Sequence, residues 1–178
     1  TDLMLVADVL RGKQLDAMVE LGIAPGSRQV LEMLARNGAL ADMIAAGARI
    51  LESGCGPCIG QGFSPGDGVV SLRTFNRNFA GRTGTKGDMC YLVSPETAVA
   101  SAIMGEITDP RDLPQLLGVE YPKIKMPREF DIDDSMIERP LDDASARAVQ
   151  VLRGSTIVVP EAPKPLPARL VGQVLLKC

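Results

Sequence analysis

Alternation of helical and strand-like segments over the first two thirds of the chain is the feature that most constrains its fold. Apolar residues at helical spacing, flanked by cap or stop residues, predict helices at residues 2–11, 28–37, 39–46 and 95–104. Short apolar or alternating segments predict strands at residues 14–21, 48–52, 69–74 and 89–93. Because strands that alternate with helices form sheets covered by helices, the sequence predicts an α/β fold.

The composition limits how the core can be built. Of the 178 residues, 46% are hydrophobic, but only 3% are aromatic and none is Trp. The core therefore has to consist of Leu, Val, Ile and Ala with some of the eight Met residues, and such aliphatic cores suit helices packed on a sheet. The length fits one ordinary globular domain plus an extended connection.

The last third of the chain has a different character. Prolines recur there, and residues 128–143 are acidic and weakly patterned. Two short apolar stretches, residues 155–159 and 170–176, flank a proline-rich segment, and we expect edge strands there or the lead into a further domain. The sequence thus predicts an α/β domain at residues 1–112, followed at residues 113–178 by an extended linker that wraps it.

Charge and hydropathy exclude several classes of function. The net charge is −3 and the basic residues form no stripe, which argues against a nucleic-acid partner. No apolar run reaches the roughly 18 residues that a membrane span needs, and the first residues resemble an amphipathic helix rather than a signal peptide. We therefore expect a soluble, cytoplasmic protein with no membrane partner. The chain has no His, which removes most zinc sites and all His-dependent catalysis.

Cys55 and Cys58 form a Cys-Gly-Pro-Cys turn directly after the predicted strand at residues 48–52. The carboxyl ends of strands are where open α/β sheets bind ligands, so this position favours a functional role. A thioredoxin-like dithiol would require a long helix after Cys58, but glycines and a proline interrupt that segment.

Three other interpretations of the cysteine turn remain open. A zinc site would need two more ligands, and only Cys90 and Cys178 are left, neither in a paired motif. The two thiols could simply be buried and unreactive in a glycine-rich turn. Iron–sulfur clusters also take thiolates at this spacing, although a third cysteine would have to come from elsewhere.

A second polar segment follows the predicted strand at residues 69–74. It contains Asn76, Arg77 and Arg82 in the string TFNRNFAGR. Guanidinium groups bind carboxylates through two parallel hydrogen bonds, so two neighbouring arginines suit a polycarboxylate substrate. The alternative is a solvated loop whose arginines pair with surface acids. Since this loop and the cysteine turn both leave strands at the same edge of the sheet, a shared site is favoured.

The strings CGPCIGQG, TFNRNFAGR and YLVSPETAVASAIMGEITDPRDL together resemble the third domain of the aconitase superfamily, which includes aconitate hydratase, homoaconitase and isopropylmalate isomerase. The resemblance covers residues 1–112 and implies a three-layer α/β/α domain with a mostly parallel sheet. The remainder resembles the linker toward the family's swivelling fourth domain.

The resemblance also implies roles for individual residues. Cys55 and Cys58 would be two ligands of a [4Fe–4S] cluster whose third cysteine lies upstream of this chain. Asn76 would lie beside the cluster, and Arg77 and Arg82 would hold substrate carboxylates. In this scheme the iron that lacks a cysteine binds the substrate and acts as a Lewis acid for loss and re-addition of water.

These roles predict a fragment of an iron–sulfur hydro-lyase with a tricarboxylate substrate. Aconitate hydratase, the enzyme of the tricarboxylic acid cycle that converts citrate to isocitrate through cis-aconitate, is the favoured interpretation. The alternatives are a homoaconitase, a 3-isopropylmalate dehydratase large subunit and, more distantly, a Cys-x-x-Cys thiol redox module; an RNA-binding relative is disfavoured by the acidic charge. We expect the isolated chain to be inactive, because its partners are the remaining domains of the same enzyme.

Overall fold

The computed structural model describes all residues except 1, 78, 124–127, 130–131, 170 and 174–178. The chain divides into two compact units, Thr1–Met136 and Ile137–Cys178. Cys178 and most of the apolar stretch at residues 170–176 are among the residues that the structure does not describe. In the described part of the chain, no helix is both long and apolar enough to cross a membrane.

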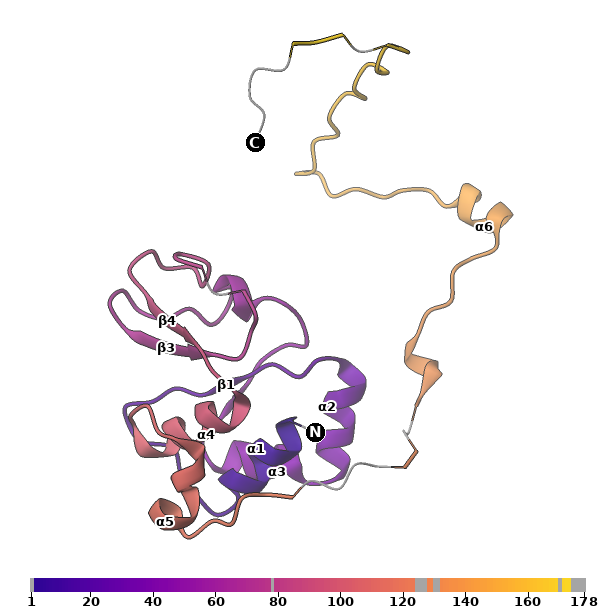
Figure 1. Ribbon diagram of the computed structural model, residues 1–178. Coiled ribbons are helices and arrows are strands. Elements are labelled where there is room, and N and C mark those ends of the chain that lie inside the picture. Colours follow the sequence, from indigo (N-terminus) through magenta and orange to yellow (C-terminus); the bar gives the residue numbers. More distant parts are fainter. Residues whose placement is uncertain (1, 78, 124–127, 130–131, 170, 174–178) are drawn as a thin grey trace. The chain divides into compact units, whose positions relative to one another are not determined.

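The described residues of the first unit form the α-helices α1 (Asp2–Leu10), α2 (Arg28–Arg36), α3 (Ala39–Ala45), α4 (Pro95–Met104) and α5 (Leu113–Leu117) (Figure 1). The first four confirm the predicted helices. The hydroxyl of Ser27 accepts a hydrogen bond from the Val30 N–H at the start of α2, and Ser94 does the same for Thr97 at the start of α4. These caps satisfy N–H groups that a helix cannot pair internally.

The strands pair in two places. β1 (Gly22–Ile23) runs parallel to β2 (Arg49–Ile50), and β3 (Val70–Arg73) runs parallel to β4 (Met89–Leu92), where the two strands lie side by side in Figure 1. The α/β class is confirmed. In the described residues the strands form two separate two-stranded sheets, and β1 and β2 are shorter than the segments from which they were expected.

The predicted strand at residues 14–21 is wrong. The Asp16 N–H donates to the carbonyl of Ala102, at the end of α4, instead of to a neighbouring strand. The Asp16 carboxylate accepts a hydrogen bond from the Met18 N–H, and the backbone carbonyl of Asp16 accepts one from the Val19 N–H. This local turn competes with an extended backbone, as Asp side chains commonly do. The apolar alternation of this segment therefore reflects a turn packed beside helices.

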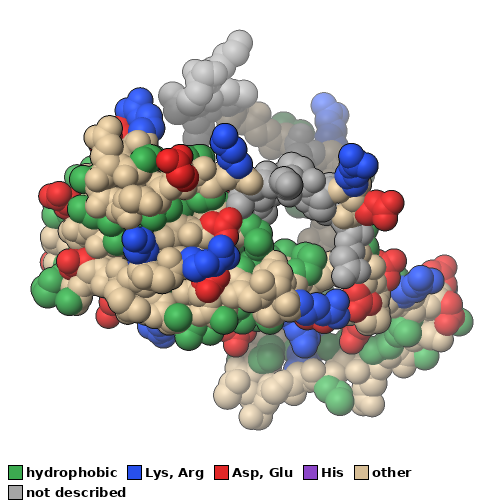
Figure 2. Space-filling view, turned by 90° about the horizontal axis from the view of Figure 1, so that it is seen from below, with side chains coloured by type: hydrophobic (Ala, Val, Ile, Leu, Met, Phe, Trp, Pro, Cys, Tyr) green, Lys and Arg blue, Asp and Glu red, His purple; other side chains and the backbone are tan. Residues whose placement is uncertain are grey.

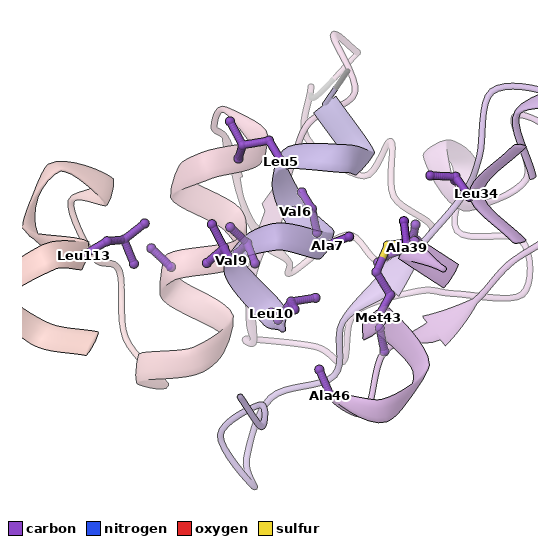
Figure 3. Packing of buried hydrophobic residues seen from close by; sticks show 14 residues of the cluster. Leu5, Val6, Ala7, Val9, Leu10, Leu34, Ala39, Met43, Ala46 and Leu113 are labelled. Carbon is purple, nitrogen blue, oxygen red and sulfur yellow. The ribbon is translucent and has the colours of Figure 1, made fainter. Parts of the chain in front are cut away.

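The hydrophobic core forms around α1. In Figure 3 the buried side chains converge on α1 from α3 on one side and from α4 and Leu113 on the other. The core residues are Leu5, Val6, Ala7, Val9, Leu10, Ile23, Leu34, Ala39, Met43, Ala46, Ala48, Val99, Ala100 and Leu113. They are small aliphatic residues and one Met, as the composition predicts.

The residues directly after 109 form helical turns that reach the core. A 3₁₀-helix, η2 (Pro110–Asp112), leads into α5, and the side chain of Leu113 is 0% exposed. Farther along, the chain forms η3 (Asp134–Met136) and α6 (Asp143–Ala148). No strand is present at residues 155–159. The expected domain boundary between residues 112 and 113 stays a prediction.

Leu113 allows a test of how tightly this segment is bound to the core. We expect Leu113→Ala to lower the free energy of unfolding by about 2–5 kcal/mol, because it removes a fully buried side chain and leaves a cavity. Leu116 lies on the same helix but is half exposed, so Leu116→Ala should have a much smaller effect. Denaturant unfolding of both variants measures the difference. Equal losses would show that α5 does not belong to the core.

Candidate functional site

The cysteine turn lies where the sequence places it, after β2. Cys55 is exposed, whereas Cys58 is buried in the short 3₁₀-helix η1 (Pro57–Ile59). Gly60 ends this helix with a φ of 78°, so no long helix follows, as the glycine pattern predicts. The structure joins the two cysteines in a disulfide, with their Cα atoms 5.5 Å apart. The two sulfur atoms are therefore held together within the turn.

The arginine loop contacts the cysteine turn through Arg82. One terminal nitrogen of Arg82, Nη2, lies 3.6 Å from the sulfur of Cys58. The guanidinium carbon is 5.9 Å from the centre of the Phe79 ring, and the buried Nε has no hydrogen-bond partner among the described residues. Arg82 thus has a donor that no protein group in the described structure uses.

Asn76 and Arg77 lie on the exposed part of the same loop. Neither forms a hydrogen bond or an ion pair with a residue that the structure describes. The structure therefore brings Arg82 to the cysteines and leaves Asn76 and Arg77 facing solvent, where a substrate could reach them. The roles of these three residues and of the two cysteines remain predictions.

Close backbone packing holds the two loops together. The carbonyl of Thr83, the residue after Arg82, lies so near Gly60 that a Cβ atom at Gly60 would be 2.1 Å from its oxygen. Ser64 donates a hydrogen bond of 3.0 Å to the same carbonyl. The Thr83 side chain is 2% exposed and donates to the carboxylate of Asp88. These contacts fix the position of Arg82 relative to Cys58.

Sequence reasoning missed two residues of this arrangement. Arg73 ends β3 beneath the cysteine turn and is 6% exposed, and Thr83 carries the contact between the loops. A charged residue inside the predicted strand at residues 69–74 is the signal that could have identified Arg73. Thr83 leaves no such signal, since its carbonyl makes the contact.

The donor set fits part of an iron–sulfur site. Two thiolates at this spacing are typical cluster ligands once the disulfide is reduced, and Nη2 of Arg82 lies 3.6 Å from the sulfur of Cys58 as a hydrogen-bond donor. The described residues contain no group of three or more potential metal ligands, and Cys90 is a separate free cysteine on β4. A complete site therefore requires at least one ligand from outside the described residues.

The face of the molecule shown in Figure 2 carries charged side chains of both signs. On the face shown in Figure 2, Lys and Arg side chains lie among Asp and Glu side chains and form no continuous basic patch. This agrees with the net charge of −3. Binding to a polyanion would need a concentrated positive surface.

Gly60 and Gly62 allow a test of the contact between the loops. Both have positive φ values, 78° and 77°, so replacement by Ala strains the backbone by about 1–2 kcal/mol at either position. Only at Gly60 does the new methyl group collide with Thr83, since Gly62 has open space around it. We expect Gly60→Ala to lower the unfolding free energy well beyond Gly62→Ala in denaturant titrations. Equal losses of unfolding free energy in the two variants would mean that the contact between Gly60 and Thr83 does not hold the loops together.

Comparison with known proteins agrees with the motifs at this site. The profile of the aconitase family (aconitate hydratase) matches residues 1–105. A mitochondrial homoaconitase from Candida parapsilosis is 38% identical over 161 residues, which are 86% of this chain and 23% of that protein. The homoaconitase large subunit of Thermus thermophilus is 46% identical over 115 residues, 63% of this chain and 27% of that protein.

A third relative has a different name. The 3-isopropylmalate dehydratase large subunit 1 of Deinococcus radiodurans is 44% identical over 118 residues, 65% of this chain and 27% of that protein. The chain spans about a quarter of the length of these curated relatives.

Proposed function

The chain belongs to the aconitase family, and we propose that it is a segment of a larger hydro-lyase of the homoaconitase or 3-isopropylmalate dehydratase type. The favoured interpretation of the sequence was aconitate hydratase. The relatives described above carry the names of the two alternatives, so these are better supported. A role in the tricarboxylic acid cycle is correspondingly less supported, and the cellular compartment stays open because one relative is mitochondrial.

The observation that carries the proposal is the contact between Arg82 and Cys58. A guanidinium donor 3.6 Å from a cysteine sulfur joins the two motifs into one site. Cys55 and Cys58 supply two thiolate ligands, and Arg77 and Arg82 supply donors for substrate carboxylates. Asn76 belongs to the same motif as the two arginines and offers a neutral donor and acceptor.

An iron–sulfur cluster bound at the reduced cysteines would supply a Lewis-acidic iron for removal and addition of water. The chain's own residues have other tasks. The buried Cys58 fixes one ligand on the turn, while the exposed Cys55 lies at the surface where ligands from other parts of the protein can join. The exposed Arg77 can bind a substrate carboxylate at the solvent-facing side of the site. Arg82 can hydrogen-bond to sulfur through Nη2, while its buried Nε has no protein partner among the described residues.

Completion of the site requires partners. The named relatives from Thermus and Deinococcus are large subunits, which implies a small subunit in those enzymes. We propose that this chain likewise works with further domains or with a separate small subunit. These parts would supply the missing cluster ligand and the acid–base groups.

Substrate assays on the complete enzyme test the proposal. The full-length protein, with its small subunit where that is separate, is reconstituted anaerobically and assayed for hydration of homoaconitate and cis-aconitate and for dehydration of 3-isopropylmalate. We expect kcat/KM for homoaconitate or 3-isopropylmalate to exceed that for cis-aconitate by about tenfold or more. Homoaconitate differs from cis-aconitate by one methylene group, which is worth about that much discrimination. A clear preference for cis-aconitate would restore the aconitate hydratase interpretation.

One observation favours a second candidate, a thiol redox module. The structure describes Cys55 and Cys58 as a disulfide. However, the short η1 ends at Gly60 and provides no long helix to activate a thiol. A redox module would catalyse reduction of a disulfide substrate such as insulin, whereas we expect no catalysis above the background of dithiothreitol.

A further inference from the structure

Arg73 is a buried cation at the end of β3. It is 6% exposed, and in the described part of the chain no carboxylate lies within ion-pair distance of it. Burial lowers the pKa of its guanidinium, but Arg remains charged because its unperturbed pKa is so high. A buried charge needs hydrogen-bond acceptors, so the partners of Arg73 show what its burial achieves.

Two of these partners are backbone carbonyls in the cysteine turn and in the segment that follows it. Nη1 donates 3.2 Å to the carbonyl of Pro57, which lies between the two cysteines, and Nη2 donates 3.5 Å to the carbonyl of Phe63. Nε donates a hydrogen bond of 2.7 Å to the hydroxyl of Ser71 on the same strand. This bond fixes the orientation of the guanidinium group. The guanidinium carbon also lies 5.7 Å from the centre of the Phe63 ring. One side chain thus ties two points of the turn segment to β3.

We propose that Arg73 is a positioning residue for the cysteine turn, holding Cys58 in place through its hydrogen bonds to Pro57 and Phe63. Planar, charge-assisted donors fix geometry more strongly than a single amine does. The consequence for cluster binding rests on the proposed function. The consequence for the cysteine pair does not, because it follows from the backbone contacts alone.

The chain offers a matched control. Arg49 on β2 also lies over the Phe63 ring, with its guanidinium carbon 5.9 Å from the ring centre. Arg49 is exposed, and none of its hydrogen bonds in the described structure reaches the cysteine turn. Loss of Arg49 therefore removes a cation from the same ring without freeing the turn.

The experiment compares the full-length wild-type protein with Arg73→Met, Arg73→Lys and Arg49→Met. The first measurement is the equilibrium in which the Cys55–Cys58 disulfide and two glutathione molecules exchange to give two thiols and glutathione disulfide. The second is the rate at which a chelator removes iron after anaerobic reconstitution. Thermal unfolding of each variant serves as the measure of global stability.

We expect Arg73→Met to shift the exchange constant toward the dithiol by about tenfold, since held thiols form a disulfide more readily and one charge-assisted hydrogen bond is worth about this factor. Iron loss should be faster by a similar factor. Arg73→Lys, which keeps one donor and the charge, should give an intermediate shift. Arg49→Met should match the wild type in both measurements.

The outcomes separate the inference from the proposed function. If the wild type takes up no cluster, the proposed function is wrong. The glutathione equilibrium alone then tests whether Arg73 positions the cysteine turn. An exchange constant in Arg73→Met equal to that of the wild type overturns the inference, and so does a lowered unfolding temperature without a shift in exchange. If Arg73→Met does not fold, Arg73→Lys and Ser71→Ala, which frees Nε, are measured instead and should both shift the constant toward the dithiol.

Discussion

Replacing Cys58 by Ser in the full-length protein is expected to abolish cluster uptake and to reduce hydro-lyase activity by more than about a hundredfold. This exceeds the 10–100-fold loss typical of residues that only support a metal ligand. Ser has nearly the shape of Cys, so the buried position in η1 should stay packed while the thiolate ligand is lost. Iron and sulfide content after anaerobic reconstitution, together with turnover, measures the effect.

Cys90→Ser is the control for this substitution. Cys90 is a half-buried free cysteine on β4, and burial raises the pKa of its thiol while the nearby Arg73 partly opposes that shift. Its neutral thiol makes it a poor ligand, and in the described part of the chain it belongs to no group of three or more potential metal ligands. The variant should keep full cluster content. A loss equal to that of Cys58→Ser would show that the assignment of the cluster ligands is wrong.

Replacing Arg77 by Lys is expected to raise KM by about ten- to a hundredfold while cluster content stays unchanged. A carboxylate held by two parallel guanidinium bonds keeps one bond and the charge when an ammonium replaces the guanidinium, and the lost charge-assisted bond is worth about 1.5–3 kcal/mol. Arg77 is exposed and contacts neither cysteine in the described structure, so the cluster should be spared. Steady-state kinetics and visible absorbance of the same preparations separate the two effects.

Arg82→Lys should behave differently, because Arg82 lies beside the sulfur of Cys58. We expect a similar rise in KM, and in addition faster loss of iron to a chelator. Arg111→Lys is a suitable control, since Arg111 is exposed and pairs with Asp109 outside the site. Unchanged KM values in both the Arg77 and the Arg82 variants would show that these arginines do not bind the substrate carboxylates.

The sequence predicted the helices well because their signals are local. Ser27 and Ser94 cap α2 and α4 with hydrogen bonds to residues three positions ahead, and Gly105 ends α4 with a positive φ. Residues 14–21 were misassigned because the partner of Asp16 is the carbonyl of Ala102, which is distant in sequence. Periodicity cannot reveal a backbone acceptor on another element.

The site was predicted in the same uneven way. Cys58 and Arg82 were expected to meet because both follow strands, and the structure places them 3.6 Å apart. Arg73 acts through the backbone carbonyls of Pro57 and Phe63, and Thr83 acts through its own carbonyl, so no motif marks either residue. The choice among family substrates could not be made from the cysteine and arginine motifs, because a site that only holds carboxylates does not distinguish the rest of the substrate.

Differential alkylation of cysteines tests the central claim most directly. The full-length protein is reduced, divided into reconstituted and cluster-free samples, treated with iodoacetamide and digested, and modification is quantified at each cysteine by mass spectrometry. The proposed function predicts that reconstitution protects Cys55 and Cys58 and leaves the reactivity of Cys90 unchanged. Equal modification of Cys55 and Cys58 in the two samples, with iron bound in the reconstituted one, would contradict it.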